Sequence, residues 1–101
     1  MSSFLEKIVG QKISAIEQSD DHVQICLDDA TILIVFDPIR SGWPLSQFVG
    51  HAIEQVAMRP REILFFLADG SFFSVLVAEE DYRGPEAMSY IGPGGERAVW
   101  N

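Results

Sequence analysis

The chain has little cysteine and few basic residues, and each shortage excludes a class of protein. One cysteine in 101 residues excludes an intramolecular disulfide framework and a multi-cysteine zinc site. Seven Lys and Arg against fifteen Asp and Glu give a formal net charge of −8. Nucleic acid is therefore not an expected partner, because phosphate backbones are bound by clustered cations.

Long apolar runs are also lacking. No run approaches the roughly 18 apolar residues of a membrane-spanning helix, and residues 1–7 do not have the basic and apolar regions of a secretory signal. We therefore expect a cytoplasmic protein that makes no contact with a membrane. Apolar residues are abundant: 48% of the residues are hydrophobic and 11% are aromatic, which excludes a disordered chain. The length of 101 residues predicts one domain over residues 1–101.

The sequence repeats itself at a spacing of 40 residues. Residues 2–37 align with residues 42–77 without a gap, and the identical pairs are Leu5/Leu45, Val9/Val49, Gly10/Gly50, Ile13/Ile53, Leu27/Leu67, Asp29/Asp69 and Val35/Val75. These matches fall at apolar positions that would face a core or at turn positions, which favours a tandem duplication over chance.

Each unit opens with a predicted short helix. Ser3 and Glu6 have the spacing of a capping box in the first unit, and Pro44 suits a first helical position in the second. Gly10 and Gly50 follow as helix stops, since glycine adopts positive φ without strain.

Three strands follow the helix in each unit. Residues 12–18 and 52–58 have apolar side chains three residues apart, which a β-bulge near Ala15 and Gln55 reconciles with a strand; a continued helix is the alternative. Residues 23–28 with 31–36, and 63–68 with 71–77, predict two hairpins. Asp69-Gly70 is a strong hairpin turn, whereas Asp29-Ala30 predicts a turn that is strained or of another type, because alanine disfavours positive φ.

The remaining segments are a linker and a tail. Residues 37–43 are predicted to link the units, and residues 87–100 to form a C-terminal hairpin of two strands, 87–91 and 97–100. The expected fold is mainly β with two short helices (α+β), in which duplicated meanders form a small barrel or packed sheets with pseudo-twofold symmetry.

Alternation along the hairpins makes both strand faces apolar. Beside the core face, the hairpins have a second face on which eight positions hold large apolar residues or cysteine. Burying one Phe or Leu is worth about 1.5–3 kcal/mol, so we expect another part of the chain or another protein to cover this face. We favour a homodimer over cover by the chain's own helices and C-terminal hairpin, or over a different partner protein. The predicted dimer face consists of Ile32, Ile34, Phe36, Leu64, Phe66 and Phe72.

No set of residues predicts catalysis. His22 and His51 lack metal-binding or catalytic neighbours, and Cys26 lies on a strand as an inert thiol in a reducing cytoplasm. The acidic runs do not have the spacing of a calcium loop, and residues 92–95 do not form a phosphate loop. The sequence predicts neither enzyme activity nor a metal or cofactor.

Loop aromatics and arginines are the candidate recognition residues, because Trp, Tyr and Arg dominate binding hot spots. They are Arg40 and Trp43 in the linker and Tyr82 and Arg83 in the tail. The alternative is that these side chains only anchor their loops.

Three features together carry a resemblance: the hydrophobic-Gly-x-x-Ile-x-x-Ile/Val opening, the Asp-Gly hairpin, and Tyr-Arg-Gly-Pro-Glu-Ala at 82–87. They resemble small bacterial domains of unknown function, and Asp29-Ala30 departs from the pattern. The resemblance implies no catalytic or binding residue.

The predicted function is a non-enzymatic interaction module that homodimerises through an apolar sheet face. Two alternatives stay open. One is an acidic, immunity-type inhibitor of a basic toxin, for which the net charge would steer the encounter. The other is a barrel that binds a small molecule inside.

Overall fold

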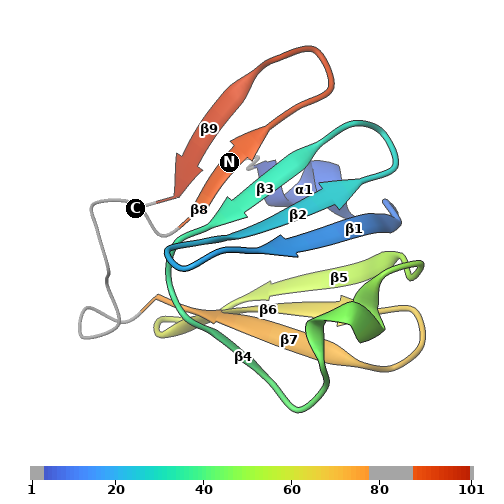
Figure 1. The fold of residues 1–101 in the computed structure, drawn as a ribbon, viewed down its shortest axis with the longest axis vertical. Coiled ribbons are helices and arrows are strands. Elements are labelled where there is room, and N and C mark those ends of the chain that lie inside the picture. The colour runs from blue at the N-terminus through green and yellow to red at the C-terminus, as the bar shows by residue number, and fades with distance from the viewer. Residues whose placement is uncertain (1–3, 78–87, 101) are drawn as a thin grey trace.

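The computed structural model describes residues 4–77 and 88–100, and these form two antiparallel β-sheets that pack face to face (Figure 1). In the first sheet the order is β1 (Ile13–Gln18), β2 (Val23–Leu27), β3 (Ile32–Val35), β8 (Met88–Ile91) and β9 (Arg97–Trp100). In the second it is β4 (Ile39–Ser41), β7 (Phe72–Leu76), β6 (Glu62–Leu67) and β5 (Ile53–Met58). The mainly β prediction is confirmed in its packed-sheet form, because the described strands do not close into a barrel.

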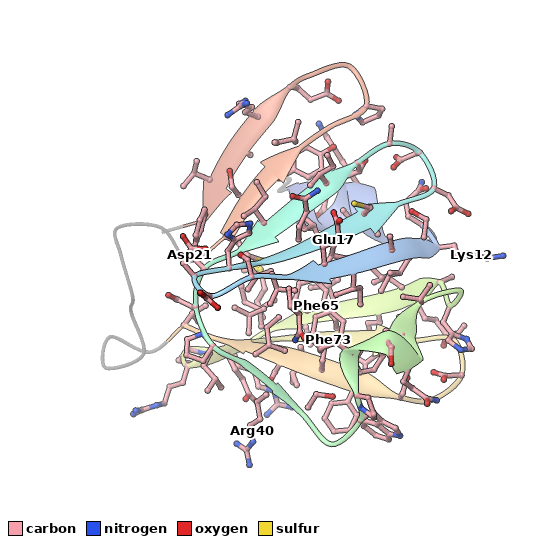
Figure 2. The ribbon with its side chains drawn as sticks, in the orientation of Figure 1. Lys12, Glu17, Asp21, Arg40, Phe65 and Phe73 are labelled. Carbon is pink, nitrogen blue, oxygen red and sulfur yellow. The ribbon has the colours of Figure 1, made fainter. Side chains whose placement is uncertain are left out.

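The core lies between the sheets. Phe65 and Phe73, on neighbouring strands, stack with ring centroids 4.8 Å apart and are fully buried (Figure 2). Ile25 and Leu33 meet them from the other sheet within the same apolar cluster. The predicted core face is therefore confirmed, since alternate residues of the hairpin strands point between the two layers.

Two short helical segments precede β1 and β5. Ile8 of the α-helix α1 (Phe4–Ile8) and Phe48 of the 3-10 helix η1 (Leu45–Phe48) are fully buried. The second helix is tighter than predicted, and Pro44 is its N-cap rather than its first residue. No helix in the described part of the chain is long and apolar enough to cross a membrane.

The predicted bulges are present in both units. The pairing of β1 with β2 shifts between Ile13 and Ala15, and that of β5 with β6 shifts between Ile53 and Gln55. The extra residue lets Ile13 and Ile16 both contact the core despite their three-residue spacing. The alternative of a continued helix is thereby excluded.

The two units contact each other through reciprocal backbone hydrogen bonds. The N–H of Gly10 donates to the carbonyl of Ile53, and the N–H of Gly50 donates to that of Ile13, both at 2.7 Å. Gly10 and Gly50 have φ of +91° and +92°, as predicted for helix stops. Residues 40 positions apart thus make equivalent hydrogen bonds, which join the two units where the strands β1 and β5 begin.

The linker, residues 37–43, contains the strand β4, which was not predicted from the sequence. After β3 the chain crosses to the second sheet, where β4 pairs with β7, the strand equivalent to β3. After β7 it returns to the first sheet, where β8 pairs with β3. The strand that follows each unit therefore lies in the other unit's sheet. The predicted C-terminal hairpin, β8 with β9, is confirmed as part of this exchange.

Candidate binding surfaces

The six residues predicted as a dimer face lie on two different surfaces. Ile32 and Ile34 lie on β3 and Phe36 follows it, whereas Leu64 and Phe66 lie on β6 and Phe72 on β7. Because the inner faces of the sheets pack together, their outer faces point in opposite directions. The expectation of one continuous face therefore needs correction: the six residues form two separate groups of three.

The outer face of the five-stranded sheet is aliphatic. Register places Cys26, Ile32 and Ile91 in one row across the sheet, and Gln24, Ile34, Ser89 and Val99 in the next. These side chains are half-buried except that of Val99, which is 47% exposed. Figure 2 shows Glu17 on this side of the sheet, away from Phe65 and Phe73.

The outer face of the four-stranded sheet is aromatic. Phe66 and Phe72 are cross-strand partners with ring centroids 5.9 Å apart. The ring of Trp43 meets that of Phe72 edge-on at 5.3 Å, and Phe72 remains 40% exposed. Arg40 is exposed on the edge strand β4, opposite Ser74. The structure thus brings two of the predicted recognition residues, Arg40 and Trp43, to this sheet.

Tyr82 and Arg83, the other two predicted recognition residues, lie outside the described residues.

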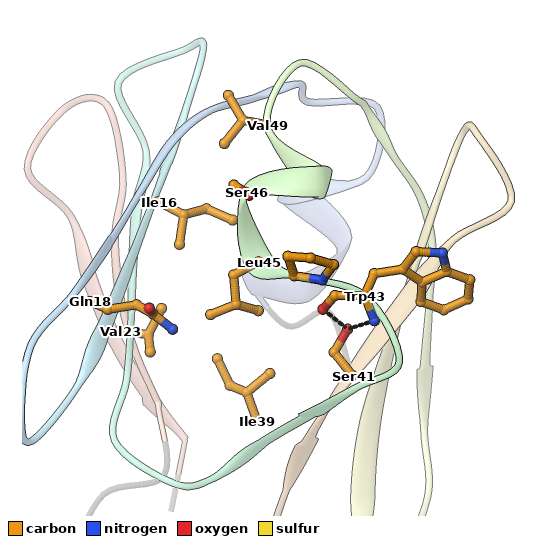
Figure 3. Close-up of a pocket in the computed structure, with 10 residues that line it drawn as sticks. Ile16, Gln18, Val23, Ile39, Ser41, Trp43, Leu45, Ser46 and Val49 are labelled. Carbon is orange, nitrogen blue, oxygen red and sulfur yellow. Dashed lines mark hydrogen bonds between the residues drawn. The ribbon is translucent and has the colours of Figure 1, made fainter.

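A cleft of about 660 Å³ opens between the two sheets beside the β4–η1 segment (Figure 3). Its lining is mostly apolar and comes from β1, β2 and that segment: Ile16, Gln18, Val23, Ile39, Ser41, Trp43, Pro44, Leu45, Ser46 and Val49. The hydroxyl of Ser41 accepts from the Trp43 N–H at 3.0 Å and donates to its carbonyl at 2.8 Å, which fixes the rim. Sequence reasoning missed the cleft, because it depends on the exchange of β4.

His22 lies in a polar turn and not in a catalytic arrangement. The Ser19 hydroxyl and the Asp21 carboxylate both contact its Nδ1, at 3.0 and 2.8 Å. A catalytic triad instead uses the two ring nitrogens for the nucleophile and the carboxylate separately. The hydrogen bonds from His22 and Ser19 lower the pKa of the exposed Asp21 carboxyl below its ordinary value.

His51 lies beside a hairpin turn, with its Nε2 3.5 Å from Oδ2 of Asp69. The other carboxylate oxygen of Asp69 accepts hydrogen bonds from the hydroxyl and the N–H of Ser71, and these bonds lower the Asp69 pKa. Ser71 is 3% exposed and donates to the carboxylate rather than to the histidine. The cluster therefore closes the turn and offers no accessible nucleophile.

The thiol of Cys26 is half-buried on the outer face of the five-stranded sheet, where the Gln24 amide lies 3.7 Å from its sulfur. Among residues 4–77 and 88–100, no three His, Cys, Asp or Glu side chains gather closely enough to hold a metal ion.

Comparison of the chain with protein-family models, with curated proteins and with solved structures finds no match.

Proposed function

We propose that the chain is a non-enzymatic, cytoplasmic interaction module that homodimerises through the outer face of its five-stranded sheet. One observation carries the proposal: outward-pointing Cys26, Ile32 and Ile91 lie side by side in one row, and Ile34 and Val99 lie in the next row with only the uncharged Ser89 between them. A polar outer face is usual when an antiparallel sheet borders water. An aliphatic face of this kind favours contact with another protein chain, because an apolar patch on a monomer commonly marks an interaction site.

The charges at the edges of this face favour a second copy as the cover. Glu17 lies on β1 at one edge of the sheet, and Arg97 lies on β9 at the other. In a twofold dimer whose axis runs parallel to the strands, the β1 edge of one copy lies over the β9 edge of the other. Glu17 and Arg97 would then form two equivalent contacts around an apolar centre, which is the self-complementarity that a twofold interface requires.

The test is light scattering of the full chain at micromolar concentration. We expect a dimer for the natural sequence and a monomer for Ile34→Glu and for Val99→Glu. Val99 is 47% exposed, so its replacement leaves the core intact and serves if Ile34→Glu does not fold. Phe72→Glu, which adds the same charge to the outer face of the other sheet, is the matched control and should remain dimeric.

Two results would contradict the proposal. One is a monomeric natural chain at these concentrations. The other is dissociation by Phe72→Glu with no effect of Val99→Glu, which would move the interface to the four-stranded sheet.

The cleft between the sheets supports a second candidate function, the binding of a small apolar molecule. Its volume of about 660 Å³ is within the usual range of ligand pockets, roughly 300–1,000 Å³. Ile16, Val23 and Leu45 give it apolar walls, and Gln18 and Ser46 give it polar groups. A thermal-shift screen with common metabolites tests this, with Leu45→Asp as the variant that should lose any shift. A flat screen would count against the cleft as a ligand site.

We also infer that the two units arose by tandem duplication and then diverged on their outer faces. The equivalent positions 26 and 66 hold Cys and Phe, positions 32 and 72 hold Ile and Phe, and positions 24 and 64 hold Gln and Leu. The matching bulges and the reciprocal hydrogen bonds support a common origin. Divergence left one aliphatic and one aromatic outer face, which favours separate roles for the two.

A further inference from the structure

Half of the described cations line one pocket of a strongly acidic chain. Arg40, Arg59 and Arg61 surround a pocket of about 450 Å³ together with Pro60, Glu62 and Leu76. The other described cations are Lys7, Lys12 and Arg97. In the described part of the chain, three arginines and one glutamate thus line this pocket, although acids outnumber bases fifteen to seven over the whole chain.

The fold brings these arginines together from separate parts of the sequence. Arg59 and Arg61 belong to the turn between β5 and β6, which the hydrogen bond from the Arg59 N–H to the Glu62 carbonyl closes at 2.9 Å. Arg40 arrives from the linker between the units, on strand β4. Figure 2 shows Arg40 pointing away from the sheets into solvent.

A second pocket of about 490 Å³, with both polar and apolar lining residues, adjoins this cationic pocket and shares Arg40 and Glu62 with it. Its floor includes Leu64 and Ser74, which are 8% and 2% exposed, and Phe72 forms a wall. The two pockets make one groove on the outer face of the four-stranded sheet, cationic at one end and aromatic at the other. We call it the Arg40 groove.

We propose that the Arg40 groove binds an acidic peptide segment of a partner protein, with two or more carboxylates at the arginines and an adjacent aromatic or large apolar side chain against Phe72. This partner class rests on the proposed role as an interaction module and uses a surface separate from the proposed dimer face. Guanidinium groups pair with carboxylates through two parallel hydrogen bonds, so several arginines in one pocket favour a cluster of carboxylates.

The charge of the whole chain narrows the choice of partner. A nucleic acid would bring one phosphate about every 1.7 Å of duplex past the fifteen acids of this chain. A short acidic segment brings a few carboxylates to one place. Arginine beside exposed aromatic rings is also the composition of protein-binding hot spots.

The experiment is selection of a random peptide library on the immobilised full-length protein, followed by fluorescence anisotropy of the selected peptides. We expect enrichment of peptides with at least two Asp or Glu next to Phe, Tyr, Trp or Leu. Their affinity should fall by about tenfold or more in Arg40→Glu and in Arg59→Glu, and it should weaken with added salt.

Lys12→Glu is the matched control, because it makes the same charge change on an exposed side chain that Figure 2 shows at a different edge of the molecule. It should leave the affinity unchanged. Phe72→Ser tests the aromatic end and should also weaken binding. Val99→Glu, which addresses the dimer face, should not, so that failure of the dimer proposal and failure of this one remain distinguishable.

Three outcomes would overturn the proposal. They are a library that yields no enriched peptide, enriched peptides without acidic residues, and acidic peptides that bind Arg40→Glu or Arg59→Glu as tightly as the natural chain. Tighter binding of single-stranded DNA than of any acidic peptide, lost in the same variants, would assign the groove to nucleic acid instead.

Discussion

Ala30 is the residue at which the two units differ most in backbone strain. Its φ is 71°, and Gly70, at the equivalent turn position, has φ of 89°. A left-handed conformation costs an L-residue such as alanine about 1–2 kcal/mol. Replacement by glycine removes this cost, but part of the gain is lost because glycine gives the unfolded chain more conformational freedom. We expect Ala30→Gly to raise the free energy of unfolding by about 0.5–1 kcal/mol, measured by urea denaturation.

Gly70→Ala is the reverse experiment and should lower the free energy of unfolding by about 1 kcal/mol. A Cβ at Gly70 would meet no atom within 4 Å, so the effect would come from the backbone alone. A loss of stability in Ala30→Gly would contradict this account. The sequence predicted either strain or another turn type here, because Asp-Ala replaces Asp-Gly, and the positive φ of Ala30 corresponds to the first of these.

Asp69 gives the folded chain a dependence on acidic pH. Hydrogen bonds from Ser71 hold its pKa below the ordinary value of 3.8, so the folded state binds this proton more weakly than the unfolded state. The contribution to stability is therefore present above pH 3.8 and is lost as the pH falls through the folded-state pKa.

We expect Asp69→Asn to be less stable than the natural chain at neutral pH and to lose less stability on acidification from about pH 5 to pH 2. Urea denaturation across this range measures the difference. Asp28→Asn, in an exposed residue beside the other hairpin turn, controls for the loss of one carboxylate. Parallel stability curves for Asp69→Asn and the natural chain would contradict the assignment.

Strand β6 shows, at the scale of an element, how the two faces of one strand differ in energy. Phe65 is fully buried and stacks on Phe73, whereas its neighbour Phe66 is half-buried on the outer face. We expect Phe65→Ala to cost about 3–5 kcal/mol of unfolding free energy. Phe66→Ala should cost clearly less, about 1–2 kcal/mol. Equal losses in thermal or urea denaturation would show that the outer face is as tightly packed as the core.

Elements whose pattern is local could be predicted, and elements that depend on distant partners could not. The bulges follow from the three-residue spacing of Ile13 and Ile16, and the C-terminal hairpin follows from its glycine-rich turn. Residues 39–41 carry too short a pattern to identify a strand, and pairing with β7 decides their conformation. The cleft and the Arg40 groove both involve this strand, which is why neither surface could be predicted from the sequence.

At the scale of the whole molecule, the sequence predicted two apolar strand faces but not that the outer ones point in opposite directions. Alternation places a side chain on one side of its own strand, and it says nothing about which strands share a sheet. The Arg59-Pro60-Arg61 turn was a signal that could have been read, because the equivalent turn in the first unit, Ser19-Asp20-Asp21, has the opposite charge. The turn alone does not predict the groove, because the groove also needs Arg40, whose position depends on the pairing of β4 with β7.

The strands β4 and β8 each pair with the sheet of the other unit, and this exchange predicts that neither half of the molecule folds without the other. A fragment of residues 1–42 would contain β4 without its partner β7, and residues 43–101 would contain β8 without its partner β3. Each fragment would also expose the inner face of its sheet. In the whole molecule these two faces form one core cluster, in which Ile25 and Leu33 of one sheet lie with Phe65 and Phe73 of the other.

We therefore expect each fragment alone to lack a cooperative thermal transition, and an equimolar mixture to regain β-sheet circular dichroism and one transition. A mixture that carries Phe65→Ala in the second fragment should associate less tightly, because the core cluster is then incomplete. A cooperative transition in one fragment alone would contradict this prediction, because that half would then be stable without the reciprocal hydrogen bonds between Gly10 and Ile53 and between Gly50 and Ile13.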